Sequence, residues 1–141
     1  MRIRYAILLM LFFAFGASAQ SVQLIKDDEA KLPVQSVKSM TRAITRGPGI
    51  KLLSPETVTA PFPFKVMFEP RGQAKIDKAS IKVEYLRGAG IDLTDRLKAD
   101  TKETGIDTHA ALAPAGEHMI RISATDSEGR QGTAEFKLTV K

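Results

Sequence analysis

The alternation of apolar and polar residues near the C-terminus is the feature that most restricts how this chain can fold. Residues 117–140 have the sequence EHMIRISATDSEGRQGTAEFKLTV. Apolar side chains stand at every second position of two stretches, at Ile120, Ile122 and Ala124 and then at Ala134, Phe136, Leu138 and Val140. Because successive side chains point to opposite faces of a strand, this period of two predicts two half-buried strands. The polar residues 126–130, DSEGR, favour a turn between them, so the stretch predicts a β-hairpin with one apolar face.

The same alternation recurs in shorter stretches upstream. It predicts strands at residues 50–53, 60–68, 81–86, 91–97 and 106–112, the fourth being a short strand and a tight bend. The last stretch is expected to bury one face, made of Ile106, Thr108, Ala110 and Leu112. Residues 76–80 are a predicted connecting turn, and residues 98–104 a predicted loop. About seven short strands with a turn every eight to twelve residues or so, and no strong helix, predict an all-β sandwich.

One part of the sequence resembles a known family. Residues 114–118 (PAGEH), residues 124–130 (ATDSEGR) and the amphipathic stretch after them resemble the last hairpin of bacterial immunoglobulin-like domains, which commonly follows the pattern G-x-h-x-h-x-h-x-A-x-D-x-x-G. The match runs from Gly116 to Val140 and extends loosely back to Phe62, without the Cys pair and core Trp of antibody-type domains. The resemblance implies a single immunoglobulin-like antiparallel β-sandwich. Its members serve as adhesion modules, spacers, substrate-binding accessories and assembly factors.

The N-terminus carries the pattern of a signal peptide. Arg2 and Arg4 precede an apolar run at residues 6–15, and residues 17–19 (ASA) form an A-x-A cleavage signature. A run of about ten residues is short for a bilayer, which needs about 20. We therefore expect residues 1–19 to be removed and the chain to be periplasmic or secreted, with no transmembrane segment in the mature chain; the alternative is a retained membrane anchor. The chain has no cysteine, so disulfides and thiol chemistry are excluded.

The basic excess lies ahead of the predicted sandwich. Residues 52–141 carry 13 basic and 13 acidic side chains, whereas residues 20–51 carry six basic and three acidic ones. We expect residues 20–49 to form a partly ordered basic leader and residues 50–141 to form the compact domain. Within the leader, apolar residues spaced by three or four favour a helix: Val34, Val37, Met40 and Ile44. The many Val, Thr and Ser residues favour instead an extended segment with a short strand paired to the sandwich, and we prefer this interpretation.

Three basic residues of the leader stand four apart, at Lys38, Arg42 and Arg46. They are candidate contacts for an anionic partner such as phospholipid head groups, lipopolysaccharide phosphates or an acidic protein. The alternative is a solvated basic tail, which is the usual role of such a charge run. Nucleic acid is not an expected partner, because the chain has two tyrosines, no tryptophan and no basic patch on the sandwich.

The sequence offers no catalytic constellation. His109 and His118 are both expected at outward positions or strand ends, and there is no G-x-S-x-G motif. Acidic residues near loops could hold calcium, but they lack EF-hand spacing: Asp92, Asp95, Asp100, Asp107, Asp126 and Glu128. Zinc lacks a third ligand beside the two histidines. We therefore predict no catalytic residue, no cofactor and no metal.

These observations favour a non-enzymatic exported binding or interaction module, whose partner is an unknown envelope protein or an anionic surface, and which we expect to be a monomer. One alternative is a membrane- or glycan-associated accessory protein that docks through the basic leader. Another is an inhibitor or enzyme that uses a surface loop such as residues 98–104. The final strand offers a further possibility, because a partner could add a strand to an open edge by backbone pairing. Lys137 and Lys141 could equally guard that edge.

Overall fold

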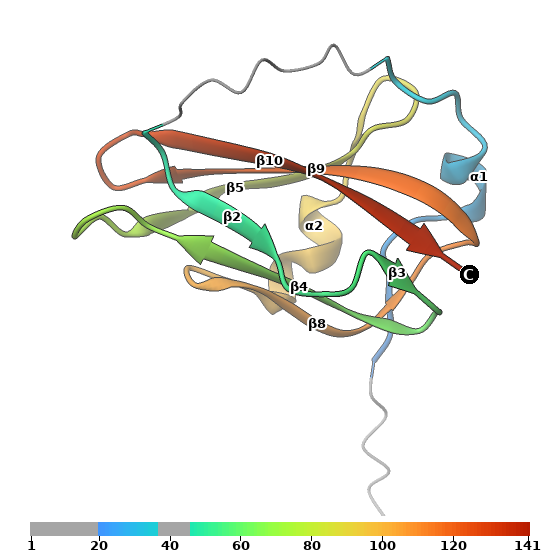
Figure 1. Ribbon diagram of the computed structural model, residues 1–141. Coiled ribbons are helices and arrows are strands. Elements are labelled where there is room, and N and C mark those ends of the chain that lie inside the picture. Colours follow the sequence, from blue (N-terminus) through green and yellow to red (C-terminus); the bar gives the residue numbers. More distant parts are fainter. Residues whose placement is uncertain (1–19, 37–45) are drawn as a thin grey trace, which may run out of the picture.

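The computed structural model describes residues 20–36 and 46–141, which form two open sheets of five strands each (Figure 1). The first sheet has β1 (Val22–Gln23), β8 (Gly105–Leu112), β4 (Phe62–Glu69) and β2 (Gly49–Leu52) in that order, with β7 (Thr101–Lys102) paired to β8. The second sheet has the order β3 (Thr57–Val58), β10 (Gln131–Val140), β9 (Gly116–Asp126), β5 (Ile76–Tyr85) and β6 (Ile91–Asp92). The predicted all-β class is confirmed, and the arrangement is compatible with a β-sandwich. No helix in the described part of the chain is long and apolar enough to cross a bilayer.

A single core of apolar side chains lies between the two sheets. The first sheet contributes Phe64, Val66 and Ile106, and the second contributes Val83, Tyr85, Ile120 and Ile122, all buried. The predicted hairpin is confirmed as β9 and β10, which pair antiparallel from Gln131 opposite Thr125 to Val140 opposite Gly116. Phe136 is only partly buried and packs at the margin of this core.

One chain segment contributes a strand to each sheet. β2 pairs with β4 in the first sheet, and β3 pairs in parallel with the end of β10 in the second. Ser54, in the connection between them, is held at β4 because its hydroxyl donates to the Pro63 carbonyl at 2.8 Å and accepts from the Lys65 N–H at 2.7 Å. The connection therefore crosses from one layer to the other at the side of the fold where β2 and β10 are the edge strands.

In two places the strand geometry differs from the predicted alternation. Along β8, Ile106 and Thr108 are buried as predicted, but the next fully buried residue is Ala111, and the prediction for Ala110 and Leu112 was wrong. The reason is a register shift between β8 and β4, because Phe64 pairs with Thr108 but Phe62 pairs with Ala111. β8 therefore has one extra residue in this interval, and beyond it the inward and outward positions of β8 are exchanged. The predicted turn at residues 76–80 is instead the first half of β5, and it bulges away from β9 between Asp77 and Lys82.

Residues 91–104 form shorter elements than predicted. The expected strand and bend at residues 91–97 is the two-residue β6 followed by α2 (Thr94–Leu97), a single helical turn. The expected loop at residues 98–104 contains a 3₁₀ turn (Lys98–Asp100) and β7. Leu93 and Leu97 are fully buried, so this turn of helix closes one end of the core.

The beginning of the leader belongs to the folded structure. β1 pairs in parallel with β8, which confirms the short strand expected in this segment. The next two residues, Leu24 and Ile25, are 0% exposed and belong to the core. Further along, α1 (Asp27–Ala30) is one helical turn, and Val34 forms an isolated antiparallel bridge with Arg87. The fold therefore includes residues well before Ile50, where the compact domain was expected to begin.

Arg96 of α2 fastens this segment to the sheets. Its Nη1 donates to the Leu24 carbonyl at 2.9 Å and to Glu29 Oε2 at 2.8 Å, and its Nη2 donates to Glu29 Oε1. The hydrogen bond from Arg96 holds the pKa of Glu29 below its usual value, although burial opposes this shift. A bidentate guanidinium–carboxylate pair of this kind fixes geometry as well as charge.

Replacing Arg96 with alanine is expected to lower the free energy of unfolding by about 2 kcal/mol, because three charge-assisted hydrogen bonds are lost and Glu29 loses its partner. Lys98→Ala is the matched control, because Lys98 is exposed on the turn that follows α2. It should change the free energy of unfolding by less than about 0.5 kcal/mol. Urea denaturation measures both. Equal stability of the two variants would show that Arg96 does not fasten the segment.

Candidate functional site

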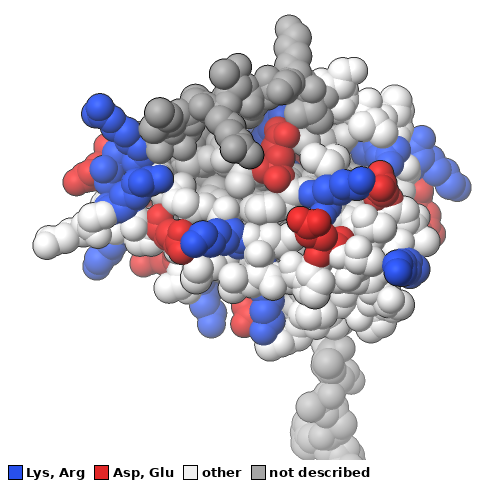
Figure 2. Space-filling model, viewed as in Figure 1, with Lys and Arg blue, Asp and Glu red and all other residues white. Residues whose placement is uncertain are grey.

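Only part of the predicted basic contact can be placed. Lys38 and Arg42 lie outside the described residues, and Arg46 is exposed just before the buried Gly47. The anionic contact through these three residues therefore stays a prediction. Figure 2 shows acidic and basic side chains interspersed on the described part of the face in view. Several are joined in ion pairs, such as Lys51 with Glu69 at 2.8 Å.

The two histidines have different environments. His109 is exposed, as predicted, but His118 is 1% exposed, and the prediction of an outward position was wrong. His118 lies two residues before Ile120 on the same face of β9, so the alternation directs it into the core. The Tyr85 hydroxyl lies 2.8 Å from His118 Nδ1, and His118 Nε2 lies 2.8 Å from the Pro114 carbonyl oxygen.

The hydrogen bonds of His118 define its protonation. A carbonyl can only accept, so Nε2 carries the proton and donates to Pro114, while Nδ1 accepts from Tyr85. Burial lowers the pKa of His118, and the hydrogen bond to Pro114 opposes this only in part. The ring is therefore neutral at pH 7 and both of its nitrogens are engaged. The pair is a satisfied polar contact of the core, with no surface that a substrate could reach.

Two of the acidic residues considered for calcium, Asp92 and Asp126, hold turns together instead. Asp126 is buried and accepts from the Glu128 N–H at 3.0 Å, the Arg130 N–H at 3.0 Å and Arg130 Nε at 2.8 Å. Burial alone would raise the pKa of Asp126, but these bonds from Arg130 and Glu128 lower it. Asp92 accepts from the Thr94 N–H at 2.9 Å, and hydrogen bonds from Thr94 lower its pKa. In residues 20–36 and 46–141, no three His, Asp or Glu side chains are grouped closely enough to bind a metal ion.

The long edge of β10 is the most distinctive surface feature. The Asp126 N–H donates to the Arg130 carbonyl, so these two residues form a hydrogen-bonded pair between β9 and β10. In an antiparallel ladder such pairs recur at every second residue, so the even-numbered residues of β10 direct their backbone groups toward β9. Odd-numbered residues therefore direct their N–H and C=O groups to the opposite side. Consistent with this, the Thr139 N–H donates to the backbone carbonyl of Glu56, just before β3, and the Lys141 N–H donates to the backbone carbonyl of Val58 in β3.

Between the ends of β10, no part of residues 20–36 or 46–141 pairs with the edge. Within the described ranges, the backbone N–H and C=O groups of Thr133, Glu135 and Lys137 have no hydrogen-bond partner. At the beginning of the strand, Gly47 lies so close that an added Cβ would be 2.1 Å from the Gln131 carbonyl oxygen. At the other end β3 covers Thr139. The open part is thus bounded on both sides and runs from residue 133 to residue 137.

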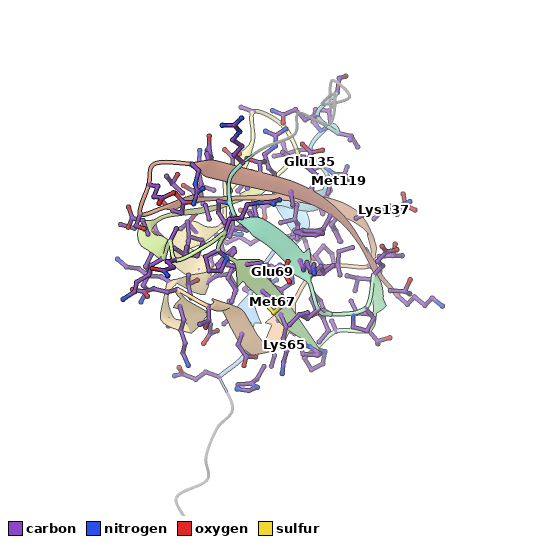
Figure 3. All side chains as sticks on the ribbon, turned by 60° about the vertical axis from the view of Figure 1, so that its left-hand side comes forward. Lys65, Met67, Glu69, Met119, Glu135 and Lys137 are labelled. Carbon is purple, nitrogen blue, oxygen red and sulfur yellow. The ribbon has the colours of Figure 1, made fainter. Side chains whose placement is uncertain are left out.

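A cleft with both apolar and charged lining residues lies beside this edge. The Leu53 N–H donates to the Lys65 carbonyl, so in the β2–β4 register the backbone groups of Ile50 and Leu52 point to the open side. Together the two edge strands line a cleft of about 370 Å³, which we call the β2–β10 cleft: Ile50, Lys51, Leu52, Leu53, Ser54, Glu56, Glu135, Phe136 and Lys137. Its wall includes the partly buried Phe136, and Leu53 at its rim is 56% exposed. Figure 3 shows β2 between β10, labelled at Glu135 and Lys137, and β4, labelled at Met67 and Glu69.

The charged side chains of this edge are held on the outer face of the sheet. Arg121 donates to Glu135 Oε1 from Nε at 3.0 Å and from Nη2 at 2.8 Å. Lys137 Nζ lies 2.7 Å from Glu117 Oε1. The inward residues of β10 are apolar or glycine, whereas Glu135 and Lys137 line the cleft from the outer face of the sheet. The ion pair with Glu117 holds Lys137 on this outer face.

The other described edges are protected in ways that β10 is not. β1 and β6 are two residues long, β2 has four residues, and β5 bulges where it extends beyond β6. Short and bulged edge strands are the usual means of preventing strand addition. β10 has ten residues, no proline and no inward charge. In the described structure its open stretch is therefore the best-suited place for an extended segment to bind.

A second hollow, of about 680 Å³, lies between the bulge of β5 and the turns after β6. Its floor consists of the buried Ile76, Ile81 and Thr101, and its rim carries both signs of charge, including Lys98 and Glu103 of the predicted loop. Nothing in this lining selects one ligand class. Comparison of the sequence with models of known protein families and with curated proteins finds no match.

Proposed function

We propose that this protein is an exported, non-enzymatic protein-interaction module that binds an extended segment of its partner along the open edge of β10. The observation that carries this proposal is the row of backbone groups at Thr133, Glu135 and Lys137 that have no partner among the described residues, directly beside a cleft whose wall includes Phe136. Strand addition is a common way of recognising peptides, in which main-chain hydrogen bonds supply affinity and alternate side chains supply specificity.

The geometry defines the chemistry of the bound segment. Its backbone exchanges N–H···O=C bonds with the open residues, each contributing about 1 kcal/mol net. Every second side chain then points toward Phe136 and the neighbouring Ile50 and Leu52, so apolar residues are favoured there. The other side chains meet the charged outer face, where Glu135 and Lys137 stand. An extended segment with alternating apolar and charged residues fits this site best.

Two sequence-based predictions complete the proposal. The signal-peptide pattern at residues 1–19 favours the periplasm or secretion, where a neutral sandwich would act among envelope proteins. An immunoglobulin-like fold is supported by strand order, because β8-β4-β2 facing β10-β9-β5 is the order E-B-A facing G-F-C in such domains. In this fold the β10 edge belongs to a rigid scaffold, so partner binding requires no rearrangement of the core.

A proline at residue 133 tests the edge directly. The Thr133 N–H points to the open side, so Thr133→Pro removes an edge donor while the ladder to β9 keeps its bonds. We expect this variant to remain folded and to lose partner binding. Ala134→Pro is the matched contrast, because the Ala134 N–H faces β9 and the loss of this ladder bond should destabilise the fold by at least about 1 kcal/mol.

Binding is measured by photo-crosslinking in envelope extract. A photoreactive residue at the exposed Leu53 samples the β2–β10 cleft, and one at the exposed Lys102 of β7 samples the opposite edge of the first sheet. We expect a defined adduct from position 53 that is absent from position 102 and is lost when Thr133→Pro is added. Adducts that are equal at both positions, or that survive the proline, would contradict the proposal.

A further inference from the structure

We propose that this protein docks on an anionic lipid bilayer through one end of the sandwich. The docking residues are Arg46, Arg71 and Lys75, which we call the turn-end cations. The observation that carries this inference is that three exposed basic side chains from separate parts of the chain are held at one end of the fold, and that no carboxylate pairs with them. The inference does not depend on the β10 edge, because it concerns a different surface.

Arg46 and Arg71 are brought together by a backbone contact. Arg71 lies in the loop between β4 and β5, and its Nε donates to the Gly47 carbonyl at 2.9 Å. Gly47 directly follows Arg46 and is buried, with its backbone against Gln131 at the start of β10. Two residues of like charge are therefore fixed close together on segments that are packed against the sheet.

The turn between β9 and β10 holds the rest of the loop. The Ser127 N–H donates to the Lys75 carbonyl at 2.7 Å, and the Lys75 N–H donates to Ser127 Oγ at 3.1 Å. Arg130 Nη2 donates to the Arg71 carbonyl at 3.2 Å, and Ala74, between the two cations of the loop, is buried. The turn-end cations therefore stand on a preformed support.

The charges at this end do not cancel. Residues 46–48, 70–75 and 126–131 form the end, on the left of Figure 1, and carry four basic and two acidic side chains: Arg46, Arg71, Lys75, Arg130, Asp126 and Glu128. Both acids are paired with Arg130. The other described residues carry 13 basic and 14 acidic side chains, so the positive excess of the described chain lies here. Figure 2 shows basic side chains gathered at this end.

The sequence outside the described ranges cannot supply the missing partner. All 16 acidic residues of the chain lie within residues 20–36 and 46–141. An uncompensated group of like charges creates a positive potential that attracts an anionic partner. The sequence alone did not indicate this group, because Arg46, Arg71 and Lys75 are separated along the chain and meet only through the contacts with Gly47 and Ser127.

The surroundings of the turn-end cations favour a lipid surface over other anionic partners. Protein interfaces concentrate their binding energy in well-packed, desolvated pockets, and single-stranded nucleic acid stacks its bases on aromatic side chains. Residues 46–48, 70–75 and 126–131 include no aromatic residue and no exposed large apolar residue, and the turn-end cations line neither hollow described above. A bilayer of anionic lipids requires only exposed basic side chains near its surface. The signal-peptide pattern favours a compartment that is bounded by such a membrane.

Binding of this kind is weak and depends on salt. Each Lys or Arg near an anionic bilayer strengthens binding about fivefold, so three of them favour anionic over neutral vesicles by on the order of 100-fold. The attraction is screened beyond a Debye length, which is about 10 Å at 0.1 M salt and about 3 Å at 1 M. We therefore expect the protein to bind anionic vesicles at about 0.1 M salt and to be released at about 1 M.

Co-sedimentation of the mature chain with vesicles tests the proposal. The vesicles consist of phosphatidylcholine, with or without phosphatidylglycerol as the anionic lipid. Arg71→Gln combined with Lys75→Gln should weaken binding to the anionic vesicles about 25-fold. Lys31→Gln combined with Lys141→Gln is the matched control, because both lysines are exposed at the opposite end of the fold and the net charge falls by the same amount. We expect this control to change binding by less than about twofold, because its charges lie beyond a Debye length from the bilayer.

Arg71→Lys separates the charge from the local anchoring. It keeps the positive charge but loses the Nε contact to Gly47, and we expect binding within about twofold of the unchanged protein, because a bilayer attracts charge and does not require a planar guanidinium. Every variant keeps Lys38 and Arg42, so any attraction through these two residues is the same in all of them.

Three results would overturn the proposal. The first is equal binding of the unchanged protein to anionic and neutral vesicles. The second is unchanged binding when Arg71 and Lys75 are both replaced by glutamine. The third is an equal loss in the turn-end variant and in the Lys31 and Lys141 control, which would assign the effect to net charge alone. None of them bears on the cross-linking test at Leu53, which would still decide the proposed function.

Discussion

Replacing Ile122 with alanine is expected to lower the free energy of unfolding by about 4 kcal/mol. Ile122 is 0% exposed and lies on β9, the middle strand of the second sheet, opposite Ala134 of β10 and Val83 of β5. Removing three carbons there leaves a cavity between two sheets whose hydrogen bonds on both sides prevent collapse. With no cysteine to cross-link the chain, this core carries most of the stability.

Urea denaturation measures this loss, with Ile122→Val as the graded control. The smaller change removes one methyl group and should cost about 1 kcal/mol. The two variants should differ in transition midpoint and share the same slope, because the surface exposed on unfolding is nearly unchanged. If Ile122→Ala were as stable as Ile122→Val, then the site would not be packed as tightly as its burial implies.

Replacing His118 with alanine is the second large change, with an expected cost of about 3 kcal/mol. The variant leaves a cavity beside Tyr85 and deprives its buried hydroxyl of an acceptor. It also leaves the Pro114 carbonyl without its donor. His109→Ala is the matched control, because His109 is exposed on β8, and its removal should change stability by less than about 0.5 kcal/mol.

The lowered pKa of His118 also makes the stability of the fold depend on pH. Burial holds the pKa of His118 below the usual 6.5, so below that pH the unfolded chain binds a proton that the folded chain does not. Stability is therefore fully present above about pH 6.5 and is lost as the pH falls from there toward the pKa of the folded state. Denaturation midpoints measured from pH 8 to about pH 5 should show this loss in the unchanged protein and in His109→Ala. If His118→Ala lost as much stability over this pH range, the pH dependence would come from other groups.

Local patterns predicted the elements that obey a simple period. The hairpin of β9 and β10 follows its alternation from Ile120 to Val140 because no bulge interrupts it. The alternation in β8 failed at Ala111, since one extra residue opposite β4 reversed the faces. His118 was expected at an outward position or strand end, but β9 already begins at Gly116, so residue 118 lies within the strand on the face of Ile120. The same alternation, applied strictly, would have placed it in the core.

Contacts between distant segments could not be predicted in this way. Leu24 and Ile25 are two apolar residues in a polar stretch, with no period to mark them, and only the pairing with β8 and the bonds to Arg96 bring them into the core. The candidate site has the same limit. The alternation shows that Glu135 and Lys137 share an outer face, but whether that edge is open depends on where β2 and β3 lie. That depends on the topology of the whole chain.

The division of one segment between the two sheets has a mechanical consequence. If one sheet slides over the other along the strands, the connection between β2 and β3 is stretched, because Ser54 fastens one end to β4 and β3 fastens the other to β10. The β3 end is the weaker attachment, since it is two residues long. Under shear we therefore expect β3 to detach first, which would lengthen the uncovered edge of β10 as far as Val140.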